Sequence, residues 1–266
     1  MSDDRAPREK RAPRLAVLID ADNVPASYAE AIFDEIASLG EASVRRIYGD
    51  WSDQRLKAWK DREAALGLVA DQQSSNTKGK NASDIGLVIA AMDFLHSGRF
   101  DGFVLVSSDS DFTRLASRIR EQGLDVFGIG QQKTPEAFRK ACKRFIYVEN
   151  LGEMVTVETV RPVEVPAGAA VLPGMVTEVV AEKLPAAVRK ETPAKAIPLI
   201  IKAMKAIDEE GEWFSLGQLG QFITQANADF DPRTYGSAKL SDLLRKTGRF
   251  ELKQGSGNSW LARDKA

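Results

Sequence analysis

Short, almost wholly apolar runs alternate with longer amphipathic stretches over residues 14–150. Runs of this kind are typical of parallel strands that are buried on both faces. The longer stretches repeat their apolar residues with the period of a helix. Strands that alternate with helices indicate βαβ units, so we expect one α/β domain with a mostly parallel sheet. The predicted strands are residues 15–20, 44–48, 67–70, 103–107, 126–129 and 145–148, and the predicted helices are 27–39, 54–66, 83–96, 112–122 and 135–143.

The rest of the chain has a different character. Residues 1–13 carry charges and prolines without an apolar core, which predicts a disordered tail. Residues 151–192 are rich in Val, Pro, Ala and Glu and keep no sustained period, so they are interpreted as a linker. Residues 193–263 form a second, smaller unit with the layout of a winged helix. Its predicted helices are 193–210, 215–227 and 239–246, and its predicted strands are 249–253 and 259–262 around a glycine-rich turn.

Composition narrows the functional classes. A net charge of −1 gives no global basic field, so any nucleic acid would have to bind through local patches. A single cysteine, Cys142, excludes an intrachain disulfide and a thiolate zinc site, and a single histidine, His96, excludes nucleases that use two histidines. No apolar run approaches the roughly 20 residues that span a membrane. A cytoplasmic protein without a membrane partner is therefore expected.

The first candidate site lies where the first predicted strand ends. The apolar run LAVLI stops at Asp20, and Asp22 and Asn23 follow before the next predicted helix. Either residue type is a good N-cap for that helix, and one such residue is enough for a cap. We therefore interpret Asp20 as a carboxylate that organises a metal ion and Asn23 as its hydrogen-bonding partner, whereas Asp22 suits either role.

A second acidic pair follows the run VLVSS at the end of the strand predicted over residues 103–107. Capping of the next helix accounts for Asp111 but leaves Asp109 unexplained. Two acids in a tight turn can both face one site. Ser108 adds a hydroxyl beside them, and we expect it to contact RNA.

Asp84 stands at the start of the helix predicted over residues 83–96, where it could simply complement the helix dipole. Its neighbours favour a further role. Lys78, Lys80 and Asn81 precede it on a glycine-containing loop that could hold a phosphodiester.

The three acidic segments are predicted to meet at one edge, because ligands of open α/β sheets bind outside the carboxyl ends of the strands. Close carboxylates repel one another by roughly 1–4 kcal/mol per pair at surface dielectric constants. A hard divalent cation, Mg²⁺ or Mn²⁺, relieves that repulsion and is held by carboxylates, water and substrate phosphate. The residues therefore predict a metal-dependent site for phosphoryl chemistry.

Four motifs taken in order resemble the NYN domain, the LabA-like branch of the PIN-like nuclease superfamily. They are IDADN, KGKNASD, VLVSSDSDF and IGQQKTPEAF, and the resemblance spans about residues 14–150. It implies a PIN-like α/β/α sandwich, an acidic centre that binds Mg²⁺ or Mn²⁺, and endoribonuclease activity. Carried across by matching position, the acidic centre and metal ligands are Asp20, Asp84, Asp109 and Asp111, supported by Asn23.

The C-terminal unit resembles an OST-HTH/LOTUS winged-helix domain. The resemblance rests on Trp213-Phe214, the stretch DPRTYGSAKLSDLLRKTGRFEL and the glycine-rich hairpin. It implies RNA binding and, in some members, protein partners. RNA contacts through phosphate pairing and stacking are expected from Arg233, Tyr235, Lys239, Arg245, Lys246 and Lys253.

Together these features predict a metal-dependent endoribonuclease that hydrolyses RNA. Two alternatives stay open. Related sequences often carry an Asp six residues after the helix-starting acid, where this chain has Ala90, so an inactive domain could instead be an RNA-binding or assembly adapter. The segment Asp20-Ala21-Asp22 also resembles the DxD motif of haloacid-dehalogenase-type phosphatases, although those carry a wider late acidic pair than Asp109-Ser110-Asp111.

Overall fold

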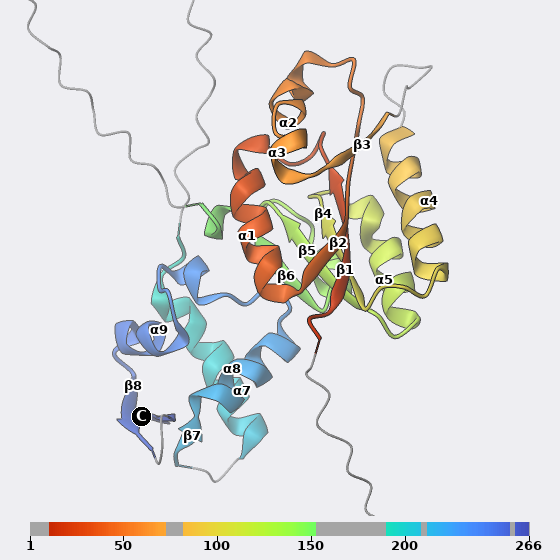
Figure 1. The fold of residues 1–266 in the computed structure, drawn as a ribbon. Coiled ribbons are helices and arrows are strands. Elements are labelled where there is room, and N and C mark those ends of the chain that lie inside the picture. Colours follow the sequence, from red (N-terminus) through yellow and green to blue (C-terminus); the bar gives the residue numbers. More distant parts are fainter. Residues whose placement is uncertain (1–10, 73–81, 153–189, 209–211, 256–258, 266) are drawn as a thin grey trace, which may run out of the picture.

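The computed structural model describes residues 11–72, 82–152, 190–208, 212–255 and 259–265 (Figure 1). These residues form two parts. The N-terminal part is a six-stranded parallel sheet with helices on both faces, and the C-terminal part joins helices to a small antiparallel sheet. The predicted α/β fold class is confirmed. The predicted tail and linker lie mostly outside the described residues.

The strand order of the large sheet places β1 at its centre. The order is β3-β2-β1-β4-β5-β6, and every neighbouring pair is parallel. The chain first moves outward from β1 to β3 and then returns to the other side of β1. The gap between the carboxyl ends of β1 and β4 is therefore the topological switch point, where open α/β sheets bind ligands. The strands are β1 (Arg14–Asp20), β2 (Glu41–Gly49), β3 (Val69–Gln72), β4 (Gly102–Val106), β5 (Asp125–Gly130) and β6 (Arg144–Tyr147).

Helices cover both faces of this sheet (Figure 1). Side chains alternate along a strand, so Val17 and Ile19 of β1 pack on the face that carries α1, whereas Leu18 packs on the face that carries α4. By the same alternation Asp20 points to the α4 face. The first face carries α1 (Ala29–Leu39), α2 (Lys57–Lys60) and α3 (Glu63–Leu66), and the second carries α4 (Ala82–His96), α5 (Thr113–Glu121) and α6 (Glu136–Ala141).

One predicted helix is wrong as a single element. Residues 54–66 form a 3-10 turn, η2 (Gln54–Leu56), followed by α2 and α3. In a continuous helix the Arg62 N–H would donate to the Ala58 carbonyl, but that carbonyl accepts the Arg62 guanidinium at 2.9 Å. The Arg62 N–H donates instead to Trp59, at 3.0 Å. The buried Trp59 indole in turn donates to the Val24 carbonyl at 2.9 Å, which holds this turn against the end of β1.

The C-terminal part has the predicted layout of three helices and a hairpin. Its core is formed by apolar residues from all three helices and the hairpin, including Ile200, Leu219, Leu243 and Phe250. The strand β7 (Phe214–Ser215) was not predicted, because two residues are too few to show an alternating pattern. The elements are α7 (Ile197–Ile207), α8 (Leu216–Ala226), α9 (Leu240–Thr247), β8 (Phe250–Gln254) and β9 (Trp260–Asp264), with sheet order β7-β9-β8. Short 3-10 turns occur at η1 (Ala26–Tyr28), η3 (Ser110–Phe112), η4 (Val148–Asn150), η5 (Pro193–Ala196) and η6 (Pro232–Tyr235).

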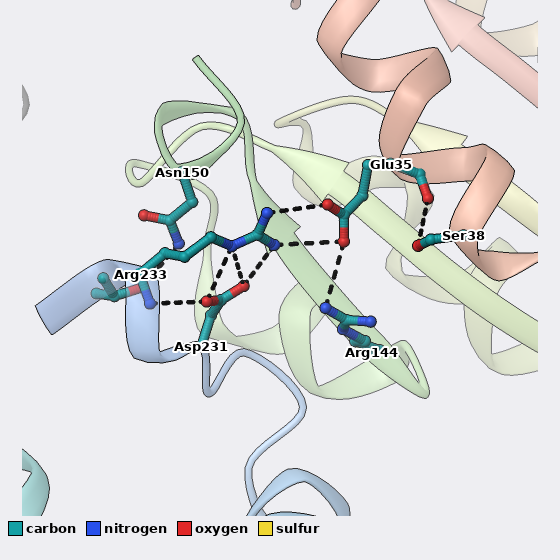
Figure 2. A network of polar contacts seen from close by, with 7 residues as sticks. Glu35, Ser38, Arg144, Asn150, Asp231 and Arg233 are labelled. Atoms are coloured by element: carbon teal, nitrogen blue, oxygen red, sulfur yellow. Dashed lines mark hydrogen bonds and ion pairs between the residues drawn. The ribbon is translucent and has the colours of Figure 1, made fainter. Parts of the chain in front are cut away.

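The C-terminal part docks along the outer strand of the large sheet. The Phe145 N–H of β6 donates to the Ala228 carbonyl at 2.7 Å, which satisfies a group that an edge strand would otherwise leave open. A polar network reinforces the contact (Figure 2). In it the Glu35 carboxylate of α1 accepts from Arg233 at 2.9 Å and from Arg144 at 3.3 Å, and Arg233 also pairs with Asp231 at 2.7 Å.

No helix in the described part of the chain is long and apolar enough to cross a membrane.

Candidate active site

Asp20 ends the central strand and is the most buried acidic side chain of the site, with 1% of its surface exposed. Its Oδ2 accepts hydrogen bonds from Asn23 Nδ2 at 2.6 Å and from Ser107 Oγ at 2.8 Å. Its Oδ1 is buried without a hydrogen-bond partner among the described residues. Burial and, to a smaller extent, the charge of Asp22 raise the pKa of Asp20, whereas the hydrogen bonds from Ser107, Asn23 and the Asp22 backbone oppose that shift. A buried carboxylate oxygen without a donor is costly, and it marks the point at which a ligand would be stabilised.

Ser107 connects the two strand ends across the switch point. Its hydroxyl donates to Asp20 and accepts the Asp109 N–H at 3.0 Å. Asp109 Oδ1 then accepts the Asp111 N–H at 2.9 Å, so Asp109 is the N-cap of η3. Capping by Asp111, the alternative that left Asp109 unexplained, is therefore wrong, because Asp109 is itself the cap. Asp111 lies in the first turn of η3 and is exposed.

Asp84 reaches the same region from α4, where it lies in the first turn and is half-buried. Burial, followed by the negative charges of Asp20, Asp109 and Asp111, raises the pKa of Asp84 to about 6. The charges of residues from the turns after β1 and β4 therefore act on the first turn of α4. A hydrogen bond between Asp22 and Ser83 ties the turn after β1 to the start of α4.

The chemistry of these side chains fits a hard divalent cation. Among the described residues, no group of three or more His, Cys, Asp and Glu side chains is placed to hold a metal ion. Mg²⁺, however, is often bound by only one or two carboxylates together with water and substrate phosphate. The unpartnered Oδ1 of Asp20 and the neighbouring Asp84 carboxylate supply oxygen ligands and uncompensated negative charge.

Ala90 does not lie in this acidic site. An α-helix turns by about 100° and rises by about 1.5 Å per residue, so position 90 is about 240° around α4 from Asp84 and about 9 Å further along it. Ala90 instead lines a separate pocket of about 380 Å³ with Arg46 and Asp93. An Asp at this position would face that pocket, so the departure at Ala90 removes no side chain from the acidic site.

The RNA contacts predicted in the N-terminal part are Lys78, Lys80, Asn81 and Ser108. The first three lie outside the described residues. Ser108 is 7% exposed, and its Oγ accepts the Gln131 N–H at 2.9 Å. Its hydroxyl therefore ties the end of β4 to the end of β5.

The six predicted contacts of the C-terminal part divide into two groups. The Arg233 guanidinium is engaged by Asp231 and Glu35 (Figure 2), and the Lys246 ammonium donates to the Gly236 carbonyl. Tyr235 is half-buried, with its ring 5.9 Å from that of Phe230. The side chains of Lys239, Arg245 and Lys253 are exposed.

Two tryptophans stand beside these exposed cations, and the sequence analysis did not predict a role for them in binding. The Arg245 guanidinium carbon lies 5.1 Å from the centre of the Trp260 ring, and Lys253 Nζ lies 3.6 Å from that of Trp213. Trp260 is 36% exposed. The sequence signal for Trp260 was its place next to the glycine-rich turn, where a large aromatic ring can stay exposed. An exposed ring is what stacking on bases needs.

Comparison with known proteins agrees with both resemblances. Residues 14–149 match the NYN domain family, and residues 179–262 match the OST-HTH/LOTUS domain family. The chain is similar to the crystal structure of a protein of unknown function from Vibrio parahaemolyticus, with 19% sequence identity and a TM-score of 0.44. That similarity covers 53% of this chain and 95% of the other. No curated protein matches the chain.

Proposed function

The chain belongs to the NYN domain family, and from that premise we propose that it is an endoribonuclease that hydrolyses RNA phosphodiester bonds with Mg²⁺ or Mn²⁺. The NYN domain points to the PIN-like nuclease superfamily, and the OST-HTH/LOTUS domain points to RNA binding. One observation carries the proposal. Asp20 Oδ1 is buried without a hydrogen-bond partner among the described residues, and the negative charges of Asp20, Asp109 and Asp111 act on Asp84.

Each acidic residue has a distinct role in this proposal. Asp20 and Asp84 would hold the cation, and Asp111 would orient the attacking water. The bound cation would polarise the scissile phosphate and lower the pKa of a water molecule. Asp109 keeps the turn after β4 in place through its bond to the Asp111 N–H.

Asn23 and Ser107 are positioning residues. Both donate to the same oxygen of Asp20, which leaves the other oxygen directed to the ligand. No imidazole is available as a general base, because the chain's single histidine, His96, ends α4. It stands about 18 Å along that helix from Asp84.

The C-terminal domain would add affinity for RNA. Lys239, Arg245 and Lys253 would pair with phosphates, and the exposed Trp260 ring beside Arg245 would stack on an unpaired base. Arg233 is assigned to domain docking instead, because its charge is already matched by Glu35 and Asp231.

The test is cleavage of end-labelled single-stranded and structured RNA by the full chain with Mn²⁺ or Mg²⁺. EDTA and Asp20→Asn should both reduce cleavage to background. Asp34→Asn, which removes an exposed carboxylate from α1, should cleave like the wild type. RNA that is bound but stays intact would contradict the nuclease and favour the adapter. Hydrolysis of a phosphomonoester with a phosphorylated Asp20 would favour the phosphatase.

A further inference from the structure

A groove of about 820 Å³ runs between the two parts of the molecule. Its N-terminal wall includes residues of α5, α6 and β6, and its C-terminal wall is formed largely by α8. The groove is distinct from the acidic site, since it lies toward the amino ends of β5 and β6. It exists only because the C-terminal part docks along β6.

The N-terminal wall of this groove is cationic. Arg120, Lys140, Lys143 and Arg144 line it, and no Asp or Glu is among the lining residues. The first three side chains are exposed, and Arg144 is half-buried. Arg144 also belongs to the docking network (Figure 2).

The exposed cations of this wall can still accept an anion. Lys143 pairs with Asp125 at 2.7 Å, and Lys140 pairs with Glu136 one helical turn away. Exposed ion pairs of this kind are weak, so a phosphate can compete with them. Arg120 donates only to the Ala141 carbonyl, at 3.3 Å, and has no carboxylate partner within the described ranges.

The opposite wall is neutral and polar. Gln221 and Gln225 lie one turn apart on α8 and are exposed, so their amide groups can donate to phosphate or ribose oxygens. Four cations and no acid among the lining residues favour a polyanion, and the phosphodiester backbone of RNA is the polyanion that the proposed function supplies.

The groove and the acidic site lie at the two ends of one helix. Asp111 precedes α5, and Arg120 is in its last turn. The helical rise puts them about 14 Å apart along the axis. Several nucleotides of extended single strand can cover that distance, so one RNA molecule can occupy both places.

We propose that this interdomain groove binds the phosphodiester backbone of the RNA substrate, outside the acidic site and without reading its sequence. This rests on the proposed function, since it takes RNA as the substrate. Arg120, Lys140 and Lys143 pair with phosphates, and the glutamines of α8 hold the strand from the other side. Docking of the C-terminal domain thus builds part of the substrate path.

The test measures binding of fluorescein-labelled single-stranded RNA to the full chain carrying Asp20→Asn, by anisotropy over a series of KCl concentrations. The groove variant adds Arg120→Gln and Lys143→Gln. The matched control adds Arg118→Gln and Lys205→Gln, which remove the same charge from exposed positions that do not line the groove.

We expect the groove variant to bind about tenfold more weakly at low salt, equally for oligo(A) and oligo(U). Its slope of log K against log salt should be smaller by about 1.4, because each single-strand phosphate contact contributes about 0.7. The control should retain the parent's affinity and slope. Gln225→Glu provides a second variant that breaks no ion pair and should also weaken binding through like-charge repulsion.

Two outcomes overturn the proposal in distinguishable ways. Equal binding by the parent, both groove variants and the control would refute the groove and leave the nuclease proposal standing. A folded parent that binds no RNA would refute both proposals.

Discussion

Replacing Asp84 with Asn should make the metal-free protein more stable, although it removes a proposed metal ligand. Burial and the charges of Asp20, Asp109 and Asp111 raise the pKa of Asp84 from 3.8 to about 6. The folded state therefore disfavours the ionised carboxyl. The penalty is absent below pH 3.8, grows between 3.8 and about 6, and is complete above that range.

The size of the effect follows from the shift in the pKa. At about 1.36 kcal/mol per pKa unit, the shift corresponds to about 3 kcal/mol. Because the side chain is only half-buried, solvent screening reduces this to about 1–2 kcal/mol. For a protein of this size we expect Asp84→Asn to raise Tm by about 2–8 °C at pH 8 in EDTA. The increase should be smaller at pH 5, where the wild-type carboxyl is mostly protonated.

The assay is thermal unfolding of the full chain followed by circular dichroism, at pH 8 and pH 5, with EDTA or with Mn²⁺. Mn²⁺ should stabilise the wild type more than the variant, because a ligand stabilises the state that binds it. Asp93→Asn lies on the same helix but lines the separate pocket, so it controls for the loss of one charge. An Asp84→Asn protein that is no more stable than wild type at pH 8 in EDTA would refute the raised pKa of Asp84, and with it the penalty from burial and from the neighbouring acids.

Three further predictions test other parts of the structure. A Cβ at Gly130 would clash with the Ser107 carbonyl, so Gly130→Ala should destabilise the fold by about 1–3 kcal/mol in urea unfolding and lower RNA cleavage. Ala90→Asp should leave metal-dependent cleavage within about threefold of wild type, because the helix turns this position away from Asp84; a larger gain would contradict the placement. Arg233→Ala should lower the free energy of unfolding by about 2–4 kcal/mol, because Glu35 and Asp231 lose a partner. Small-angle scattering should then show the two parts separating, and an unchanged profile would count against this network.

Much of the fold was determined locally. Continuous apolar runs such as LAVLI specify strands that are buried on both faces, and helical periods between them specify a βαβ alternation. These patterns need only neighbouring residues, so all six strands of the large sheet were predicted to within a few residues. The helix over residues 54–66 is interrupted at Arg62, whose N–H donates to the Trp59 carbonyl while its side chain donates to the Ala58 carbonyl. Periodicity does not report which carbonyl a backbone N–H takes.

The positions of Asp20 and Asp109 at strand ends follow from the same local pattern, since each stands where an apolar run stops abruptly. What periodicity could not supply was which strand ends are adjacent. Only the order β3-β2-β1-β4-β5-β6 brings Ser107 to Asp20, 87 residues away in sequence. The pairing of Arg233 with Glu35, 198 residues apart, likewise depends on how the two parts dock. Local patterns thus specify the strands and helices and place acids at the strand ends, whereas the partners of those acids depend on tertiary packing, because the free energy of a contact between distant residues is set by the whole fold.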